Sequence, residues 1–464
     1  MILNRPARIT QNIRGLLRLP LPEGGGWGVG LRLSSSIRLS IAAILLAALT
    51  AQAQPADDKA AAQKAAAEKT KAVQKAAKEA AEKLKARQTR PDSETLAKRL
   101  VDAAAIREND IVLIRGDSRD AEQLEDIAIA VRQRNAFPIL RITTDRLTQK
   151  LYDETPPSSD SQVDPIEAHL AATITAIISI DADHAPRLFN HVPAPRIAAR
   201  MKVQATLDQL MFQRNVRRIS LGRDLYPTAP TANRYALTVE ELDRAFWYAC
   251  TADPAPIRDA ADAVMSQLSA GNQVAITGPN GTDLKFRIQN RRILFNDGLI
   301  SEDEARAGGP QAQACLPAGE AYTSVIPGTA EGKVVCDTLS FGGREIQNLS
   351  ISFKAGRITA INGRGVEHLK LLYQATASKG ELAWLDIGLN PDIAIPRGVK
   401  PLCPTPAGMV SIGIGNNLWA GGDNAEPFQL TLYLPGTTVK VDNAPLVKDG
   451  VLAPTPVIPV LITP

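Results

Sequence analysis

The stretch DIVLIRGDSRDAEQLEDIAIAVRQRNAFPILRI, residues 110–142, decides the fold class. It contains a short apolar strand, a helical pattern of polar and apolar residues, and a second apolar strand. Two further cycles of the same kind end in the apolar segments 176–180 and 218–221. Short apolar strands that alternate with helices predict a mostly parallel sheet covered by helices.

The turn after the first strand lacks the motif that binds a dinucleotide, the usual ligand of such a sheet. It reads Gly116-Asp-Ser-Arg-Asp120, without the GxGxxG pattern that brings a backbone close to a pyrophosphate. We therefore expect no nucleotide binding at this turn.

The pattern changes after a helical connector at residues 239–268. Strand-like segments now follow one another through glycine-containing turns, and one helix, 366–377, interrupts them. These segments are 273–277, 283–288, 291–295, 332–337, 349–353 and 357–361. The predicted fold is thus an α/β N-terminal domain with a mostly parallel sheet (93–255), plus a β-rich, antiparallel C-terminal domain of α+β type (256–464).

The first 53 residues predict a signal peptide. They hold six arginines and one acid, then the apolar run 39–49 and an Ala-x-Ala site at Ala51 and Ala53. Eleven apolar residues are too few for a bilayer core of about 30 Å, so no stable membrane span is expected after signal removal. The expected location is periplasmic or otherwise exported; an uncleaved membrane anchor is the alternative.

Charge and composition exclude further classes of protein. The formal charge of the chain is +4, and removal of six positives and one negative makes it +4 − 5 = −1, which excludes nucleic-acid binding as an expectation. Residues 54–92 are rich in Ala, Lys and Glu and predict a solvated, partly helical linker. Four cysteines exclude a disulfide-stapled miniprotein, although Cys315 and Cys336 are a conceivable pair in an exported protein.

Common catalytic motifs are missing from the sequence. None of its four histidines has a paired-ligand spacing such as HExxH, and neither a GxSxG elbow nor a CxxC motif occurs. Three other motifs do stand in a fixed order. They are Gly281-Thr-Asp-Leu-Lys-Phe286, Leu316-Pro-Ala-Gly-Glu-Ala-Tyr-Thr323 and Gly380-Glu-Leu-Ala-Trp-Leu-Asp-Ile-Gly-Leu-Asn-Pro391.

In this order and spacing, the chain resembles the aminopeptidase T / aminopeptidase S family over about residues 94–450. The resemblance implies a two-metal exopeptidase that removes N-terminal residues from peptides, and homodimers. Its first two metal-binding glutamates would be Glu320 and Glu381. The family then has His-x-Ala-x-Gly, a Tyr three residues later, and His-x-Asp after a Gly-Gly-x-Asn stretch.

This chain departs from the family at four of those positions. Ser411 stands in place of the first His, Leu418 in place of the Tyr, and Gln429 and Thr431 in place of the His-x-Asp pair. Two glutamates alone are fewer than the three protein ligands of a usual catalytic zinc site. Neutral Ser, Gln and Thr bind such cations poorly. Substitute ligands are conceivable among His368, Asp386, Asp423 and Glu426.

The leading hypothesis is an exported aminopeptidase-T-like protein with a degenerate metal site, no catalytic residue and no bound cofactor. It would be weak or inactive as a peptidase and would bind peptides, with Glu320 and Glu381 vestigial or weak as ligands. One alternative is an active aminopeptidase that uses Glu320 and Glu381 with substitute ligands and a divalent metal (Zn, Co or Mn). The other is a structural envelope protein.

Overall fold

The structure is a computed structural model that describes residues 89–182, 188–377, 379–393 and 403–453, together with Lys75 and Glu82. The predicted signal peptide, most of the predicted linker, and His184 lie outside the described residues. The described residues from Thr89 onward belong to one compact unit. In the described residues, no helix has the length and apolarity needed to cross a membrane.

The first half of this unit contains the predicted parallel sheet, here called sheet A. Its strands are β1 (Ile111–Asp117), β2 (Phe137–Thr143), β3 (Ala176–Ile180), β4 (Arg217–Leu221) and β8 (Gln313–Leu316). They lie in the order β2-β1-β3-β4-β8, and all neighbours are parallel. The sequence therefore predicted the first four strands correctly, whereas β8 joins them from a distant part of the chain.

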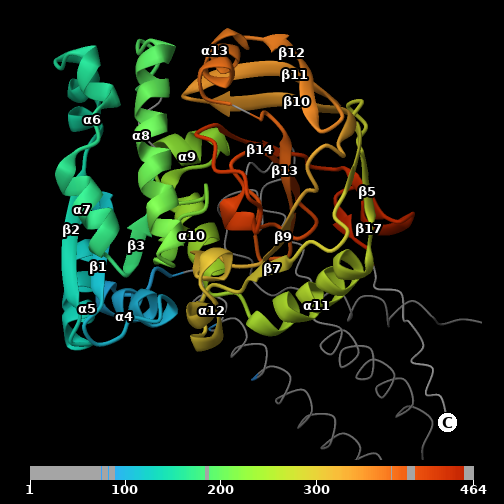
Figure 1. The fold of residues 1–464 in the computed structure, drawn as a ribbon. Helices are drawn as coiled ribbons and strands as arrows, with labels where there is room; N and C mark the ends of the chain where they lie inside the picture. The colour runs from blue at the N-terminus through green and yellow to red at the C-terminus, as the bar shows by residue number, and fades with distance from the viewer. Residues whose placement is uncertain are drawn as a thin grey trace, which may run out of the picture. The chain divides into compact units, whose positions relative to one another are not determined.

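Helices flank sheet A, as Figure 1 shows. One face packs on α4, α5 and α10 through a cluster that includes Leu100, Leu124 and Trp247, and the other packs on α7 and α8 through Ile177 and Met211. Most of these helices begin at an Asp or Thr whose side chain accepts a backbone hydrogen bond, which offsets an unpaired N–H group. The helices of this half are α4 (Ser93–Ala103), α5 (Ala121–Gln133), α6 (Asp145–Asp153), α7 (Pro165–Thr173), α8 (Ala194–Gln213), α9 (Ala229–Arg234) and α10 (Val239–Cys250).

The second half contains two further sheets, and all their pairings are antiparallel. Sheet B has the order β12-β11-β10-β6-β5-β16-β17-β18. Its strands are β5 (Gln273–Thr277), β6 (Asp283–Arg287), β10 (Glu331–Phe341), β11 (Arg344–Lys354), β12 (Arg357–Arg364), β16 (Thr438–Val441), β17 (Ala444–Lys448) and β18 (Val451–Leu452). The parallel and antiparallel halves agree with the predicted fold class.

Sheet C is the smaller antiparallel sheet and has the order β15-β14-β13-β9-β7. Its strands are β7 (Ile293–Asn296), β9 (Glu320–Ser324), β13 (Leu382–Gly388), β14 (Val410–Gly415) and β15 (Gln429–Tyr433). Three helices accompany the two sheets: α11 (Pro254–Ala270), α12 (Glu302–Ala307) and α13 (Glu367–Thr376). Helix α13 also packs on α8 through Leu372 and Ala198, and the two helices lie side by side in Figure 1.

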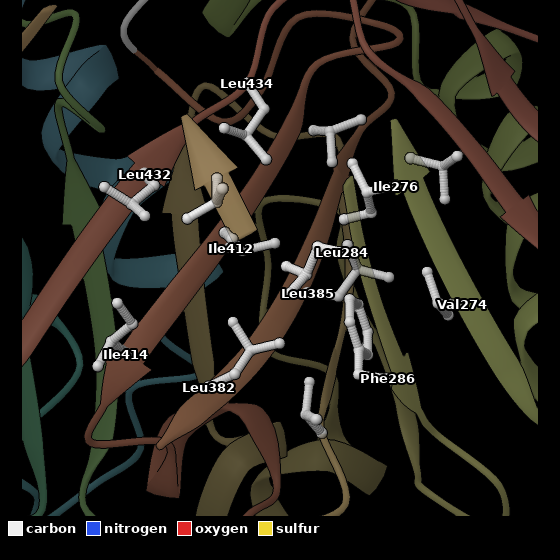
Figure 2. Packing of buried hydrophobic residues seen from close by; sticks show 14 of the residues in the cluster. Val274, Ile276, Leu284, Phe286, Leu382, Leu385, Ile412, Ile414, Leu432 and Leu434 are labelled. Atoms are coloured by element: carbon white, nitrogen blue, oxygen red, sulfur yellow. The ribbon is translucent and has the colours of Figure 1, made fainter. Parts of the chain in front are cut away.

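The main core lies between sheets B and C. Figure 2 shows Leu385, Ile412 and Leu432 of sheet C facing Ile276 and Leu284 of sheet B. Because successive side chains of a strand point to opposite faces, alternate residues of sheet C enter this core, apart from a register shift between Leu382 and Trp384 in β13. Each such buried aliphatic side chain contributes about 1.5–3 kcal/mol through the hydrophobic effect. The other face of sheet C is left for polar residues.

The cysteines do not link these layers. None of the four is in a disulfide bond, so the conceivable pairing of Cys315 with Cys336 is absent from the structure. Cys315 lies in β8 of sheet A and Cys336 in β10 of sheet B, so the two thiols belong to different sheets. Sequence could not show this because the placement of β8 in sheet A depends on a long-range pairing.

Candidate functional site

A cavity of about 410 Å³ lies between sheet A and the face of sheet C that is turned away from the main core. Sheet A contributes residues from along β1, β3, β4 and β8 and from the loops at the carboxyl ends of β3 and β4, and such loops are where ligands bind in open parallel sheets. The sheet A residues that line the cavity are Arg115, Ile177, Ser179, Arg218, Ile219, Ser220, Gln313, Ala314 and Cys315, with Asp181, Arg223 and Asp224 in the loops that follow β3 and β4.

The cavity-facing side of sheet C, here called the polar face, follows from strand register. Asp386 pairs with Tyr322 on one side and with Ser411 on the other, and Ser411 pairs with Tyr433. Directly opposed residues of neighbouring strands share a face, so one row of polar side chains crosses four strands. The polar face comprises Asn296, Glu320, Tyr322, Trp384, Asp386, Ser411, Gln429, Thr431 and Tyr433.

Glu320 enters the cavity because of the turn that precedes it. Gly319 has φ +112, and a Cβ atom there would lie 3.0 Å from the backbone nitrogen of Asn390. Only glycine fits this close approach in the left-handed region. The amide of Asn390 donates a hydrogen bond of 2.8 Å to the Ala318 carbonyl. The glycine-glutamate motif and the Asn-Pro motif therefore meet in space and fix the start of β9.

The carboxylate of Glu320 is buried, with 1% of its surface exposed, and both of its oxygens accept hydrogen bonds. Arg223 donates from Nε to both carboxylate oxygens at 2.9 and 3.1 Å, and from Nη2 to Oε2 at 2.6 Å. The Thr405 hydroxyl donates to Oε1 at 3.0 Å. A fork of this kind is among the stronger ion pairs in proteins because it combines full charges with two-point geometry.

The loop that carries Arg223 has an uncommon backbone. Gly222 has φ +147, and the next two residues, Arg223 and Asp224, have φ +48 and +63. Positive φ is unfavourable for residues other than glycine and is found preferentially at functional sites. The Tyr433 hydroxyl of sheet C holds the loop by donating to Asp224 Oδ2 at 2.7 Å. Although burial alone would lower the pKa of Arg223, the charge of Glu320 outweighs it and the pKa is raised well above its usual value.

Asp386 is a second carboxyl group that lines the cavity, and unlike Glu320 it accepts no hydrogen bond. None of its side-chain surface is exposed, and neither of its carboxylate oxygens has a hydrogen-bond partner. The nearest cation is Arg223, whose Nη2 lies 3.8 Å from Oδ2. Burial, and next the negative charge of Glu320, raise the pKa of Asp386 well above its usual value, against the opposing effect of Arg223.

Several further polar groups around the cavity lack partners in the structure. They include Asn296 Nδ2, Trp384 Nε1, Trp419 Nε1 and Arg218 Nη2. A buried donor without a partner costs about 1–3 kcal/mol, so a cluster of such groups is uncommon unless water or a ligand completes it. The cavity therefore presents unpaired donors and the unpaired carboxyl group of Asp386 to a small polar ligand.

The predicted site residues separate into two sets. Glu320, Gln429 and Thr431 line the cavity, and Ser411 lies on the polar face next to Asp386 with its hydroxyl unpaired. Glu381 and Leu418 are not among the cavity-lining residues. Glu381 forms an isolated bridge with Arg357 at the start of β13. Leu418 begins the 3₁₀ helix η5 (Leu418–Ala420), whose Trp419 reaches the cavity instead.

Of the conceivable substitute ligands, only Asp386 lines this cavity. Glu426 accepts a hydrogen bond of 2.8 Å from the Lys379 amide, and His368 lies in α13. Asp423 is exposed. Because these three residues do not line the cavity, they cannot join Glu320 in one coordination sphere in this structure.

The residues present do not fit a divalent metal of the kind that the resemblance implies. The oxygens of Glu320 already accept hydrogen bonds from Arg223 and Thr405, and the positive charge of Arg223 lies within 4 Å of Asp386. In the part of the chain that the structure describes, no group of three or more His, Cys, Asp or Glu residues could hold a metal ion. A second cation would meet the guanidinium group in place of free ligands.

Sequence reasoning missed Arg223 and named Asp386 only as one substitute ligand among several. A signal for Arg223 was present, because Gly222-Arg223-Asp224 directly follows a predicted parallel strand, where binding residues gather. For Asp386 the signal was weak. The segment around it, β13, is buried throughout, so no polar–apolar alternation marks its faces.

Comparisons with known proteins agree with this architecture. The model of the thermophilic metalloprotease (M29) family matches residues 89–383. The solved structure of wild-type AmpT from Thermus thermophilus has a TM-score of 0.58 at 15% identity, covering 78% of this chain and 99% of that one. At this identity the likeness shows a common fold.

A second solved structure, 2,5-dihydroxypyridine dioxygenase from Pseudomonas putida KT2440, has a TM-score of 0.48 at 13% identity and covers 78% of this chain and 96% of that chain. No curated protein matches the sequence.

Proposed function

The chain belongs to the thermophilic metalloprotease (M29) family, and from this premise we propose that it is an exported member that binds short peptides without hydrolysing them efficiently. The family match ends at Ala383, before Asp386, Ser411, Gln429 and Thr431. These are the positions where the polar face of sheet C would have to supply further metal ligands.

The single observation that carries the proposal is the ion pair between Arg223 and Glu320. A buried carboxylate needs a compensating cation. In a metallopeptidase that cation is the metal ion, which also activates the attacking water and polarises the scissile carbonyl. Here the guanidinium of Arg223 is the compensating cation, at 2.6 Å from Glu320. A guanidinium has no vacant orbital with which to bind and acidify water, so it supports binding and not hydrolysis.

The cavity itself favours peptide-sized ligands. Its volume of about 410 Å³ lies within the range of small-molecule sites, about 300–1,000 Å³. Tyr322, Trp384 and Trp419 form an aromatic cluster at its wall. Aromatic walls next to unpaired donors suit a ligand that combines apolar side chains with amide groups.

The test is metal content measured together with turnover. The exported protein is purified, incubated with Zn²⁺, Co²⁺ or Mn²⁺, desalted and analysed by inductively coupled plasma mass spectrometry. Hydrolysis of leucyl-p-nitroanilide is followed in parallel, and calorimetry measures the binding of leucyl-leucine in the presence of chelator. We expect substoichiometric metal, no turnover above the buffer rate, and saturable binding of the dipeptide.

The contrary outcome would be stoichiometric metal with turnover that Glu320→Gln abolishes. That result would establish the rival function, an active aminopeptidase with substitute ligands. Glu381→Gln is the matched control for this experiment. Because Glu381 does not line the cavity, its substitution should change neither the metal content nor the turnover if the proposed function is correct. Loss of both would instead support the rival function, in which Glu381 is a ligand.

A further inference from the structure

Two arginines of sheet A face the cavity on the side opposite the polar face of sheet C. Arg115 lies in β1 and Arg218 in β4, and β3 lies between them. Arg115 pairs with Ser179, and Arg218 pairs with Ile177, two residues earlier on the same strand. Residues two apart on a strand share a face, so both arginines are on one side of the sheet. The strands β1 and β4 are two spacings of about 4.8 Å apart, a separation that two long side chains can bridge over β3.

These two positive charges are poorly compensated. Arg218 has its nearest acidic partner, Asp208, at 3.5 Å, and its Nη2 has no hydrogen-bond partner. Arg115 makes no hydrogen bond or ion pair with the residues that the structure describes. Burial, with the charge of Arg115 in addition, lowers the pKa of Arg218, although Asp208 opposes this effect. Two adjacent guanidinium groups that face a cavity are a binding site for an oxygen anion.

We infer that Arg115 and Arg218 bind the C-terminal carboxylate of a short peptide in this cavity, an inference that rests on the proposed peptide-binding function. The carboxylate is favoured over a phosphate group by the other charges of the cavity. Asp181, Asp224, Glu320 and Asp386 also line it, and acidic groups repel a dianion more strongly than a monoanion. A zwitterionic peptide matches a site with arginines on one wall and an unpaired carboxyl group on the other.

The consequence is a limit on peptide length. A site of about 410 Å³ that binds a terminal carboxylate admits a peptide of a few residues and is too small for a long internal segment of a chain. Trp384 and Trp419 line the same cavity, so indole fluorescence reports on its occupancy. The affinity for a peptide should therefore depend on its free carboxylate, whatever its side chains are.

The experiment compares leucyl-leucine with leucyl-leucinamide on the full exported protein in chelator, by titration calorimetry and tryptophan fluorescence. A lost charge-assisted hydrogen bond reduces affinity severalfold, so we expect the free acid to bind at least tenfold more tightly than the amide. Arg218→Gln should reduce the affinity for the acid about tenfold and leave that for the amide unchanged. The matched control is Arg214→Gln, which removes an exposed arginine that does not line the cavity.

Each of the other outcomes would contradict a particular part of the proposal. Equal affinity of acid and amide would overturn the carboxylate site and leave the peptide-binding function in place. Binding of neither peptide would contradict the proposed function and, with it, the site that rests on it. Displacement of the peptide by inorganic phosphate at lower concentration than by acetate would reassign the two arginines to a phosphate ligand. Because the peptide comparison uses the unmodified protein, it does not depend on how a variant folds.

Discussion

At the scale of single residues, Asp386 is the group whose titration the fold changes most plainly. Burial and the charge of Glu320 raise its pKa well above the usual value. That usual value is about 3.9 for a free Asp. The folded chain therefore binds more protons than the unfolded chain from about pH 4 up to the raised pKa. In that window the free energy of unfolding falls as pH rises, by about 1.4 kcal/mol per pH unit for one group.

Replacement of Asp386 by Asn should remove this dependence. We expect Asp386→Asn to gain stability over the wild type as pH rises from 4 to 8, because an amide cannot ionise in the buried site. Urea unfolding at several pH values measures the difference. Asp423→Asn changes an exposed carboxylate and serves as the control, with no trend expected. A constant difference between Asp386→Asn and wild type would show that Asp386 titrates as it does in water.

The ion pair of Arg223 with Glu320 gives a second prediction at this scale. Arg223→Met leaves a carboxylate that is 1% exposed without its cation. Removal of one partner from a buried pair costs about 3–5 kcal/mol. Adding Glu320→Gln should recover much of that loss. The comparison is Arg107→Met, which breaks an exposed pair with Glu302 and should cost less than about 1 kcal/mol. Similar losses in both single variants, measured by urea unfolding, would contradict a buried role for Arg223.

At the scale of elements, two nearby positions of β14 should respond differently to substitution by alanine. A Cβ atom on Gly413 would lie 1.8 Å from the ring of Trp384 on β13. Gly413→Ala should therefore displace the Trp384 ring, destabilise the fold by about 1–3 kcal/mol and change the tryptophan fluorescence. Two residues earlier, Ser411 carries a buried hydroxyl without a partner.

Ser411→Ala on the same strand is the matched control for Gly413→Ala. It removes an unsatisfied group and adds no atom, so the stability should stay unchanged or rise by up to about 1 kcal/mol. Thermal unfolding with fluorescence detection follows both variants. If Gly413→Ala were as stable as Ser411→Ala, the packing of Trp384 against β14 would be wrong.

The same elements show what the sequence could and could not predict. Residues 176–180 form a strand where the apolar run indicated it, because a parallel strand covered on both faces is almost continuously apolar. Residues 217–221 form the next strand, although only Ile219 and Leu221 of it are apolar. Strands β13 and β14 are also buried along their whole length. Their polar residues, such as Asp386, are buried at a cavity between the sheets and not on an exposed face, so the alternation that usually marks a strand face is hidden. The position of Glu320 was predicted, whereas its pairing with Arg223 depends on the distant β4 loop.

At the scale of the whole molecule, sheet C separates two chemical environments. One face packs with sheet B in the main apolar core, and the other closes a cavity that holds charged groups from both halves of the chain. The family match spans both halves, yet most of β13 and all of β14 and β15, which complete the cavity, lie beyond it. A fold of this kind keeps its packing when the cavity side chains change, because the two faces of a strand are stabilised independently.

The last prediction concerns the N-terminal segment, which lies outside the described residues. The first described residue is Lys75, so cleavage after Ala53 removes no described strand or helix. We expect the exported protein to begin at Gln54, which intact-mass spectrometry of a periplasmic extract measures, and to carry the net charge of −1 that follows from +4 − 5. Deletion of residues 39–49 should retain the chain, uncleaved, in the cytoplasm, because the apolar segment is what the export machinery binds. A full-length mass in the membrane fraction would instead show that this segment is an uncleaved anchor.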